Sequence, residues 1–261
     1  MQKELRTVRV GPARLHHLNE AEVISLILSS LEQGLGGWLV NPNVDVLRQM
    51  AADPELRGLV DTATLRIADG APLEWAARLS GQRLPPRVPG ANFIWTLSAA
   101  AATAGRTVFL LGGAPGVASR AADALREAAP TLAVAGTHSP PWGFENDEAA
   151  QAVLRDHLLA ADPDIVFCGL GFPKQERLMS ALTLEFPSTW FIGSGASIAF
   201  AAGDIPRAAT WMSRLGIEWI FRLVSEPRRL AHRYIVDDIP YALTLMADSY
   251  RTRRFAREQQ R

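Results

Sequence analysis

Polar residues gather directly after a hydrophobic run in the stretch PDIVFCGLGFPKQERLM, residues 163–179. The run at 165–168 reads as a buried strand, glycines and a proline form a turn, and Lys174, Gln175 and Glu176 follow. Proline is tolerated in the first turn of a helix, where free backbone N–H groups can bind anions. We therefore expect these side chains around a helix N-terminus at a ligand-binding edge, although such residues also serve simply as helix caps.

Two glycine-rich loops, GGAPG at residues 112–116 and GSG at 193–195, each follow a run with strand character. Backbone N–H groups in such turns between strand and helix can cradle a phosphate. Neither loop has the G-x-G-x-x-G spacing of dinucleotide-binding proteins, and glycine is common in any tight turn. The loops gain weight because we expect them at the same sheet edge as Asn43, Asp69 and Gln175. The candidate N–H donors are Gly112, Gly113, Gly193 and Gly195.

Signatures of metal binding and of nucleophilic catalysis are weak. The five histidines are scattered without ligand spacing, and there is no G-x-S-x-G elbow. Asp162-Pro163-Asp164 resembles the D-x-D motif that holds a metal and a nucleotide in many sugar transferases. It precedes its strand and would lie at the opposite edge of the sheet, so we interpret it as a turn. We expect no metal site.

Strand-like runs alternate with helical patterns along most of the chain. GWLVNPN predicts a strand ending at residues 41–43, and TATLRIADGAPLEW predicts a strand ending near Ala68, a turn at Asp69-Gly70 and a helix with Pro72 in its first turn. TVFLLGGAPGVASRAADALREAAP repeats this order, and LAVAGTHSPPWGF adds a strand and a long loop. The alternation predicts an α/β fold, a Rossmann-like parallel sheet with flanking helices, whose ligands bind where strands end.

The composition is that of an ordinary globular protein. The chain has 261 residues, 48% of them hydrophobic, and its 27 basic and 27 acidic side chains cancel, so nothing indicates an overall attraction to nucleic acid. The single cysteine, Cys168, lies in an apolar strand and favours a reducing cytoplasm. No window reaches the roughly 18 uncharged apolar residues of a membrane span, so we expect a soluble or peripheral protein.

The character of the chain changes after Gly203. Residues 204–261 carry 11 arginines against seven acidic residues, whereas residues 1–203 carry 16 basic and 20 acidic ones. We therefore divide the chain into a Rossmann-like catalytic domain, 1–203, and a basic, aromatic-rich helical appendage, 204–261. The appendage is either a packed helix with solvated arginines or an arginine face for diphosphate beside an apolar face for lipid. On an ideal helix its candidate arginines fall within about 80° of each other, although Pro227 disturbs the phase: they are Arg214, Arg222 and Arg229.

Several segments together resemble a known family. NPN, ADG followed by RVPG, FLLGGAPGVA, PDIVFCGLGFPKQE and RAATWMSRLGIEWIFRLVSEPRRLAHRY resemble the WecG/TagA/CpsF family of bacterial glycosyltransferases over about residues 38–235. The resemblance implies an inverting hexosyl- or N-acetylhexosaminyltransferase that joins a sugar from a UDP-sugar to a sugar on undecaprenyl diphosphate. Such enzymes build teichoic acid linkage units, enterobacterial common antigen, or capsular and exopolysaccharides. A Rossmann-like core, activity without a metal or other cofactor, and a membrane-engaging C-terminal appendage are also implied.

By matching positions, Asp69 corresponds to the family's proposed general base, and Asn43, Arg87 and Gln175 correspond to polar pocket residues. Without a metal, arginines and helix N-terminal amides must stabilise the departing diphosphate, and Lys174 could face phosphate. The implied partners are a UDP-sugar, a lipid-diphosphate-linked sugar and an anionic membrane surface, with no nucleic acid. The sequence leaves the oligomeric state open, a homo-oligomer included. The implied location is cytoplasmic, on the inner face of the cytoplasmic membrane.

Two positions depart from the family pattern. Ala199 stands where an aspartate usually follows the G-x-G loop, and Asn41 stands where threonine is frequent. The donor therefore stays open between an N-acetylmannosamine-type sugar and a hexose such as glucose or galactose. Two other functions remain: a nucleotide- or NAD-binding enzyme of another class, or a catalytically silent member of the fold. The missing dinucleotide fingerprint argues against the first, and the joint presence of Asp69, Arg87 and Gln175 argues against the second.

Overall fold

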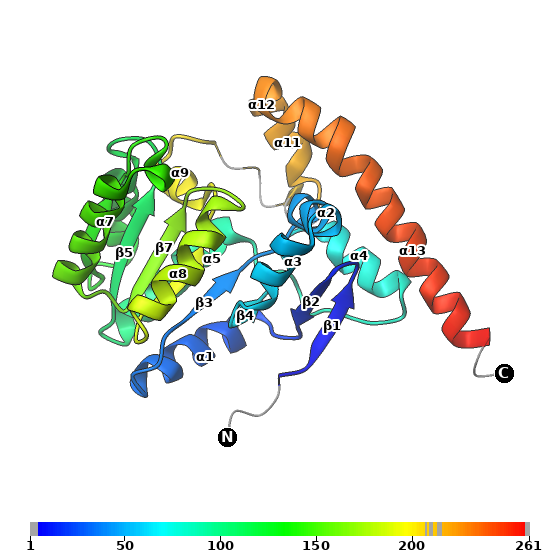
Figure 1. Cartoon of the computed structure of the whole chain (residues 1–261), viewed down its shortest axis with the longest axis horizontal. Helices are drawn as coiled ribbons and strands as arrows, with labels where there is room; N and C mark the ends of the chain where they lie inside the picture. Colours follow the sequence, from blue (N-terminus) through cyan, green and yellow to red (C-terminus); the bar gives the residue numbers. More distant parts are fainter. Residues whose placement is uncertain (1–4, 207, 209–210, 213–215, 259–261) are drawn as a thin grey trace.

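A six-stranded parallel sheet forms the centre of the molecule (Figure 1). The structure is a computed structural model that describes residues 5–206, 208, 211–212 and 216–258, without the side chains of residues 229, 256 and 257. The strand order is β4-β3-β8-β7-β5-β6, and all neighbours are parallel. The strands are β3 (Gly37–Val40), β4 (Leu65–Arg66), β5 (Thr107–Gly112), β6 (Ala133–His138), β7 (Ile165–Gly169) and β8 (Trp190–Gly193).

The central strands are continuous hydrophobic runs because helices cover both faces of the sheet. One face packs against α1 (Glu20–Glu32), α5 (Gly90–Thr103), α6 (Val117–Ala128) and α9 (Ser197–Ala201). The other packs against α2 (Val44–Ala52), α3 (Pro54–Asp61), α4 (Ala71–Leu79), α7 (Glu148–Ala161) and α8 (Lys174–Glu185), and the short 3-10 helix η1 (Phe144–Asn146) precedes α7. The predicted Rossmann-like α/β fold is confirmed.

An antiparallel hairpin precedes the sheet and was not expected from the sequence. It pairs β1 (Thr7–Val10) with β2 (Ala13–His16). Its residues alternate between exposed and buried positions, and Gly11 has a positive φ of 54° in the turn. The alternation in TVRVGPARLH was the available signal. The hairpin matters for the site because it packs against α4, the helix that follows Asp69.

The C-terminal appendage is helical in its described part. It consists of α11 (Glu218–Ser225), α12 (Pro227–Ala231), the π-helical segment η2 (His232–Asp238) and α13 (Ile239–Glu258). Pro227 begins a new helix and disturbs the phase, as the sequence indicated, so Arg222 and Arg229 lie on different helices and not on one regular stripe. Arg214 lies outside the described residues. No helix in the described part of the chain is long and apolar enough to cross a membrane.

The appendage packs against the rest of the molecule through α13. Figure 1 shows α13 running beside α4, and Leu245 of α13 is buried in the same core as α2 and α4. The Tyr241 hydroxyl donates a hydrogen bond to the carbonyl oxygen of Leu47 in α2, at 3.1 Å. The appendage therefore shares hydrophobic core with residues 1–203, while the division of the chain at residue 203 stays a prediction.

Candidate active site

A cavity of about 870 Å³ opens at the carboxyl ends of four neighbouring strands, β4, β3, β8 and β7. One wall consists of the loops that follow these strands, and the other consists of α11, η2 and α13 of the appendage. The site therefore lies between the two parts of the chain that the sequence distinguishes. Parallel α/β sheets bind ligands at this edge, and the volume suits a ligand as large as a nucleotide sugar.

Asp69 lies on the sheet side of this cavity. Its carboxylate accepts a hydrogen bond from the backbone N–H of Gly90, the first residue of α5. Burial, followed by the nearby Glu218 carboxylate, raises the Asp69 pKa from 3.8 to about 7, against the opposing influence of Arg222, Arg87 and the Gly90 N–H. A carboxylate with a pKa near the working pH is well matched to proton abstraction.

Asn41 and Asn43 come from the loop after β3, and both line the cavity. The Asn43 side-chain oxygen accepts from the Val46 N–H at 3.1 Å, so it caps α2. The Asn41 amide nitrogen donates to the Val88 carbonyl at 3.3 Å, while its buried side-chain oxygen has no partner among the described residues. A buried oxygen without a partner is costly, so Asn41 offers an acceptor to a bound molecule.

Arg87 also lines the cavity, as the sequence predicted. Its backbone N–H donates to Glu74 Oε1 at 2.7 Å, and its guanidinium Nη1 lies 3.8 Å from the same oxygen. Its side chain is 16% exposed, which limits its freedom. Glu74 of α4 thus holds Arg87 beside Asp69.

Gln175 reaches the cavity, but its amide is already bound within the protein. Its Oε1 accepts from the backbone N–H groups of Leu170, Gly171 and Gly195, and its Nε2 donates to Glu176 Oε1 at 2.8 Å. The expectation that Gln175 offers both a donor and an acceptor to sugar hydroxyls therefore needs correction. In this structure its contacts hold the loops after β7 and β8 together.

The glycine loop after β8 lines the cavity as expected, with Gly193 and Gly195 both present. A Cβ at Gly193 would lie 3.1 Å from Gln175 Nε2, so the absence of a side chain there leaves room for that amide. The N–H of Gly195 is one of the groups bound by Gln175, at 3.3 Å. Gly193 therefore contributes space, and Gly195 contributes a contact between loops.

Lys174, Gly112 and Gly113 do not line the cavity, which corrects their predicted roles. Lys174 Nζ lies 2.6 Å from Glu145 Oε1 and over the ring of Trp142 at 4.8 Å, so it binds the loop after β6. Gly112 ends β5 and Gly113 follows it, whereas the cavity lies at the ends of β4, β3, β8 and β7. A Cβ at Gly112 would collide with the Gly169 backbone, so glycine there serves the close approach of β5 and β7.

Arg222 of α11 brings a positive charge from the appendage into the cavity. Its guanidinium carbon lies 5.5 Å from the centre of the Phe200 ring, and its buried Nε has no hydrogen-bond partner among the described residues. Arg222 also opposes the rise of the Asp69 pKa, which places the two charges close together. Of the other predicted arginines, Arg214 lies outside the described residues, as does the side chain of Arg229.

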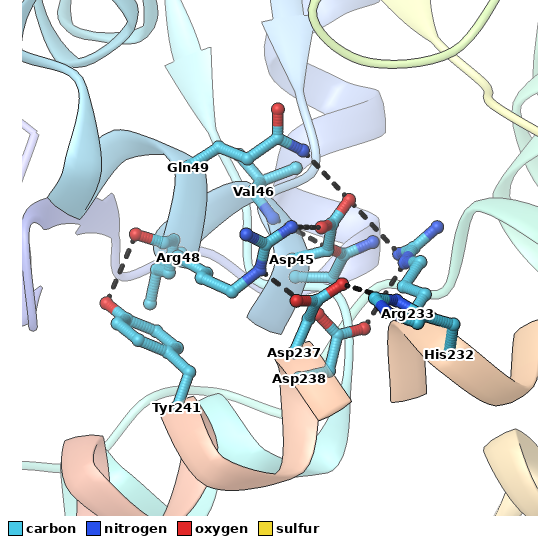
Figure 2. Close-up of polar contacts among 11 residues, drawn as sticks. Asp45, Val46, Arg48, Gln49, His232, Arg233, Asp237, Asp238 and Tyr241 are labelled. Atoms are coloured by element: carbon cyan, nitrogen blue, oxygen red, sulfur yellow. Dashed lines mark hydrogen bonds and ion pairs between the residues drawn. The ribbon is translucent and has the colours of Figure 1, made fainter. Parts of the chain in front are cut away.

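A cluster of charged side chains fixes the appendage to α2, and we call it the docking cluster (Figure 2). Asp45 Oδ1 accepts from Arg48 Nη2 at 2.8 Å, and its Oδ2 lies 3.4 Å from Arg233 Nη2. Arg233 Nε donates to Asp238 Oδ2 at 3.2 Å, and Arg48 Nε lies 3.7 Å from Asp238 Oδ1. Two carboxylates and two guanidinium groups thus neutralise one another at one end of the cavity.

Sequence reasoning missed the docking cluster and Glu218, whereas it placed Glu176 at the ligand-binding edge without giving it a role in the site. The available signals were Asp45 two residues after Asn43, and the charged residues that recur among apolar ones in IEWIFRLVSEPRRLAHRYIVDD. Ala199 does not line the cavity, although Ser197 and Phe200 of the same helix do. The alanine packs against the hydrophobic core beneath α9. Its departure from the family pattern therefore leaves the described cavity wall unchanged.

No cluster of three histidine, cysteine, aspartate or glutamate side chains that could hold a metal occurs among the described residues. Asp162 ends α7 with a positive φ of 40°, and Asp164 Oδ2 accepts from the Thr107 backbone N–H at 2.8 Å. The interpretation of Asp162-Pro163-Asp164 as a turn at the opposite edge is confirmed.

Known proteins resemble this chain over most of its length. The family described as "Glycosyl transferase WecG/TagA/CpsF family" matches residues 8–255. An N-acetylglucosaminyldiphosphoundecaprenol N-acetyl-beta-D-mannosaminyltransferase of Bacillus subtilis (strain 168) is 25% identical over 225 residues, which are 86% of this chain and 85% of that protein. The protein of the same name from Bacillus spizizenii (strain ATCC 23059 / NRRL B-14472 / W23) is 27% identical over 199 residues, 76% of this chain and 75% of its own length. Because the family match spans almost the whole chain, the protein belongs to the WecG/TagA/CpsF family of glycosyl transferases.

Proposed function

We propose that this glycosyl transferase moves a sugar from a UDP-sugar to a sugar on undecaprenyl diphosphate, with inversion and without a metal ion. The observation that carries the proposal is Asp69, whose pKa is raised to about 7 in a cavity that also receives Arg87 and Arg222. A base and cationic groups in one cavity are what a single displacement requires.

The residues divide the reaction between them. Asp69 takes the proton from the acceptor hydroxyl as its oxygen attacks the anomeric carbon of the donor. The bond between this carbon and the diphosphate oxygen breaks, and UDP leaves with the electron pair. Arg222 and Arg87 stabilise the negative charge that develops on the diphosphate, because both guanidinium groups lie near Asp69.

The relatives' names supply the first donor and acceptor to test. Both relatives are named as transferases of N-acetylmannosamine to N-acetylglucosaminyldiphosphoundecaprenol. Ala199, which left the donor open, packs away from the cavity, so it gives no reason to exclude the same donor here. We propose UDP-N-acetylmannosamine as the donor, with UDP-glucose and UDP-galactose as the alternatives.

The exposed surface of the appendage suits a lipid-linked acceptor. Several large apolar side chains of the appendage are exposed, and Arg228 is exposed as well. Apolar and arginine side chains together favour the boundary between water and an anionic membrane. We therefore propose that this surface meets the inner face of the cytoplasmic membrane. The exposed apolar side chains in the described part of the appendage are Trp211, Ile220, Val224, Ile235, Val236, Ile239, Leu243, Tyr250 and Phe255, of which Ile239 and Leu243 also line the cavity.

The test is a transfer assay with a short-chain lipid diphosphate N-acetylglucosamine acceptor and a panel of UDP-sugars. We expect a product whose mass increases by one N-acetylhexosamine, with a matched Asp69→Asn variant as the inactive control. A product with glucose or galactose instead would replace the proposed donor. Absence of product with every UDP-sugar, from protein that binds UDP, would contradict the proposal.

A further inference from the structure

We propose that Glu176 is a positioning residue, which fixes the orientation of the Gln175 side-chain amide and thereby the two loops that form the cavity floor. The inference rests on the proposed function only in treating this cavity as the substrate site. Glu176 touches the cavity, is 1% exposed, and is not needed for the proton transfer proposed for Asp69.

Gln175 holds the floor through its oxygen atom. Its Oε1 accepts from the N–H groups of Leu170 at 3.4 Å and Gly171 at 3.2 Å, both after β7, and from Gly195 at 3.3 Å, after β8. One side-chain atom therefore joins two loops that belong to different strands. These loops line the cavity, so their relative position determines the shape of its floor.

This arrangement works only in one of the two orientations of the amide. A carboxamide has almost the same shape after a half-turn, but the turn would place its NH₂ group against three N–H donors. Glu176 Oε1 accepts from Gln175 Nε2 at 2.8 Å, and this contact requires the orientation in which Oε1 faces the backbone. Since Gln175 is 6% exposed, little water is present to compensate for the wrong orientation.

Apart from its hydrogen bond with Gln175, the burial of the Glu176 carboxyl is unfavourable. Its second oxygen, Oε2, is buried without a hydrogen-bond partner among the described residues, and burial raises the pKa of the carboxyl to about 7. An apolar side chain could fill the same space without this cost. What an apolar side chain cannot do is accept the hydrogen bond from Gln175.

The experiment compares Glu176→Leu with Glu176→Gln in the full chain. The glutamine keeps an oxygen that can accept from Gln175 Nε2, whereas the leucine does not. We expect kcat/KM with UDP-N-acetylmannosamine to fall about 10- to 100-fold in the leucine variant, because small misplacements in a site are expensive. The glutamine variant should stay within about threefold of the wild type, by the same reasoning.

Two further measurements separate positioning from general damage. Leu182→Ala removes a buried side chain two turns along the same helix; it should lower stability but leave kcat/KM nearly unchanged. The amide NMR resonances of Gly171 and Gly195 should shift in Glu176→Leu and stay in place in Glu176→Gln. If Glu176→Leu does not fold, Gly193→Ala replaces it, because its methyl group would press on Gln175 Nε2.

The outcomes distinguish this inference from the proposed function. Wild-type protein that transfers no sugar contradicts the proposed function, while the glycine resonances still test the role of Glu176. Unchanged resonances in Glu176→Leu, or equal losses of kcat/KM in the leucine and glutamine variants, would overturn the positioning role.

Discussion

Replacing Asp69 by asparagine should make the protein more stable and less active at the same time. The folded-state pKa of about 7 lies about three units above the usual 3.8, which corresponds to at most about 4 kcal/mol of unfolding free energy. Asp69 is partly exposed to the cavity, so solvent reduces this amount. We expect a gain of about 1–2 kcal/mol in the asparagine variant near pH 8.

The gain in unfolding free energy of the asparagine variant over the wild type should increase with pH. Between pH 3.8 and about 7 the folded wild type binds the Asp69 proton more tightly than the unfolded chain does. Its unfolding free energy therefore decreases as the pH rises through this window, relative to the variant. The difference between the two proteins should be small near pH 4 and reach its full size above pH 7.

The same substitution should lower the activity, although it raises the stability. Loss of a general base costs about 10²- to 10⁴-fold in rate, and UDP affinity should change little because Asp69 acts on the acceptor. Wild-type kcat/KM should rise as the pH increases toward 7 and then level off, since the deprotonated carboxylate is the active form.

Urea unfolding at pH 5 and pH 8, together with turnover and UDP titration, measures all three effects. Asp204→Asn is the matched control, because Asp204 pairs with Arg120 at the surface and does not line the cavity. An asparagine variant with wild-type turnover would refute the assignment of Asp69 as the base. A variant that is less stable at pH 8 than the wild type would refute the account of its raised pKa.

Three further predictions concern the appendage and the leaving group. Arg222→Ala should lower kcat about 10²- to 10³-fold on a soluble acceptor analogue, because loss of a charge-stabilising group has this effect. The variant should still sediment with anionic liposomes, and a wild-type kcat would refute the role of Arg222 in stabilising the leaving group. Arg233→Ala leaves Asp45 and Asp238 without this partner and should lower the free energy of unfolding in urea by about 1–3 kcal/mol. An unchanged unfolding midpoint would show that the docking cluster does not hold the appendage. Product formation should survive EDTA, and a loss restored by magnesium or manganese would overturn metal-independent transfer.

Much of the fold could be predicted because its strands are continuous hydrophobic runs followed by turn residues. GWLV and IVFC became β3 and most of β7, with their polar followers at the cavity edge. The β1–β2 hairpin was missed because its short alternating pattern lies before the first βα unit. Local patterns thus identify strands in a parallel sheet more readily than a four-residue hairpin strand.

The candidate site was predicted in part. Asp69, Asn43 and Arg87 line the cavity because strand ends meet at one edge. Lys174 turns away from the cavity although Gln175 reaches it, since successive helix residues point about 100° apart and the sequence does not give the helix rotation.

Strand order explains why the predicted phosphate-binding loop at residues 112–116 does not line the cavity. The loop at 112–116 follows β5, which lies beyond β7 and away from the four strands that end at the cavity. A sequence shows which loops follow strands but does not state which strands are neighbours. For the same reason, the contact between Asp45 and Arg233 could not be foreseen, because it depends on how η2 returns to α2.

The configuration of the new glycosidic bond tests the central claim most directly. A single displacement, with Asp69 activating the acceptor hydroxyl, must invert the anomeric carbon, so an α-linked UDP-sugar gives a β-linked product. The one-bond coupling between the anomeric carbon and its proton, measured by NMR on the purified product, reports this configuration. The account predicts a β-linked sugar, and an α-linked sugar from the same donor would contradict it.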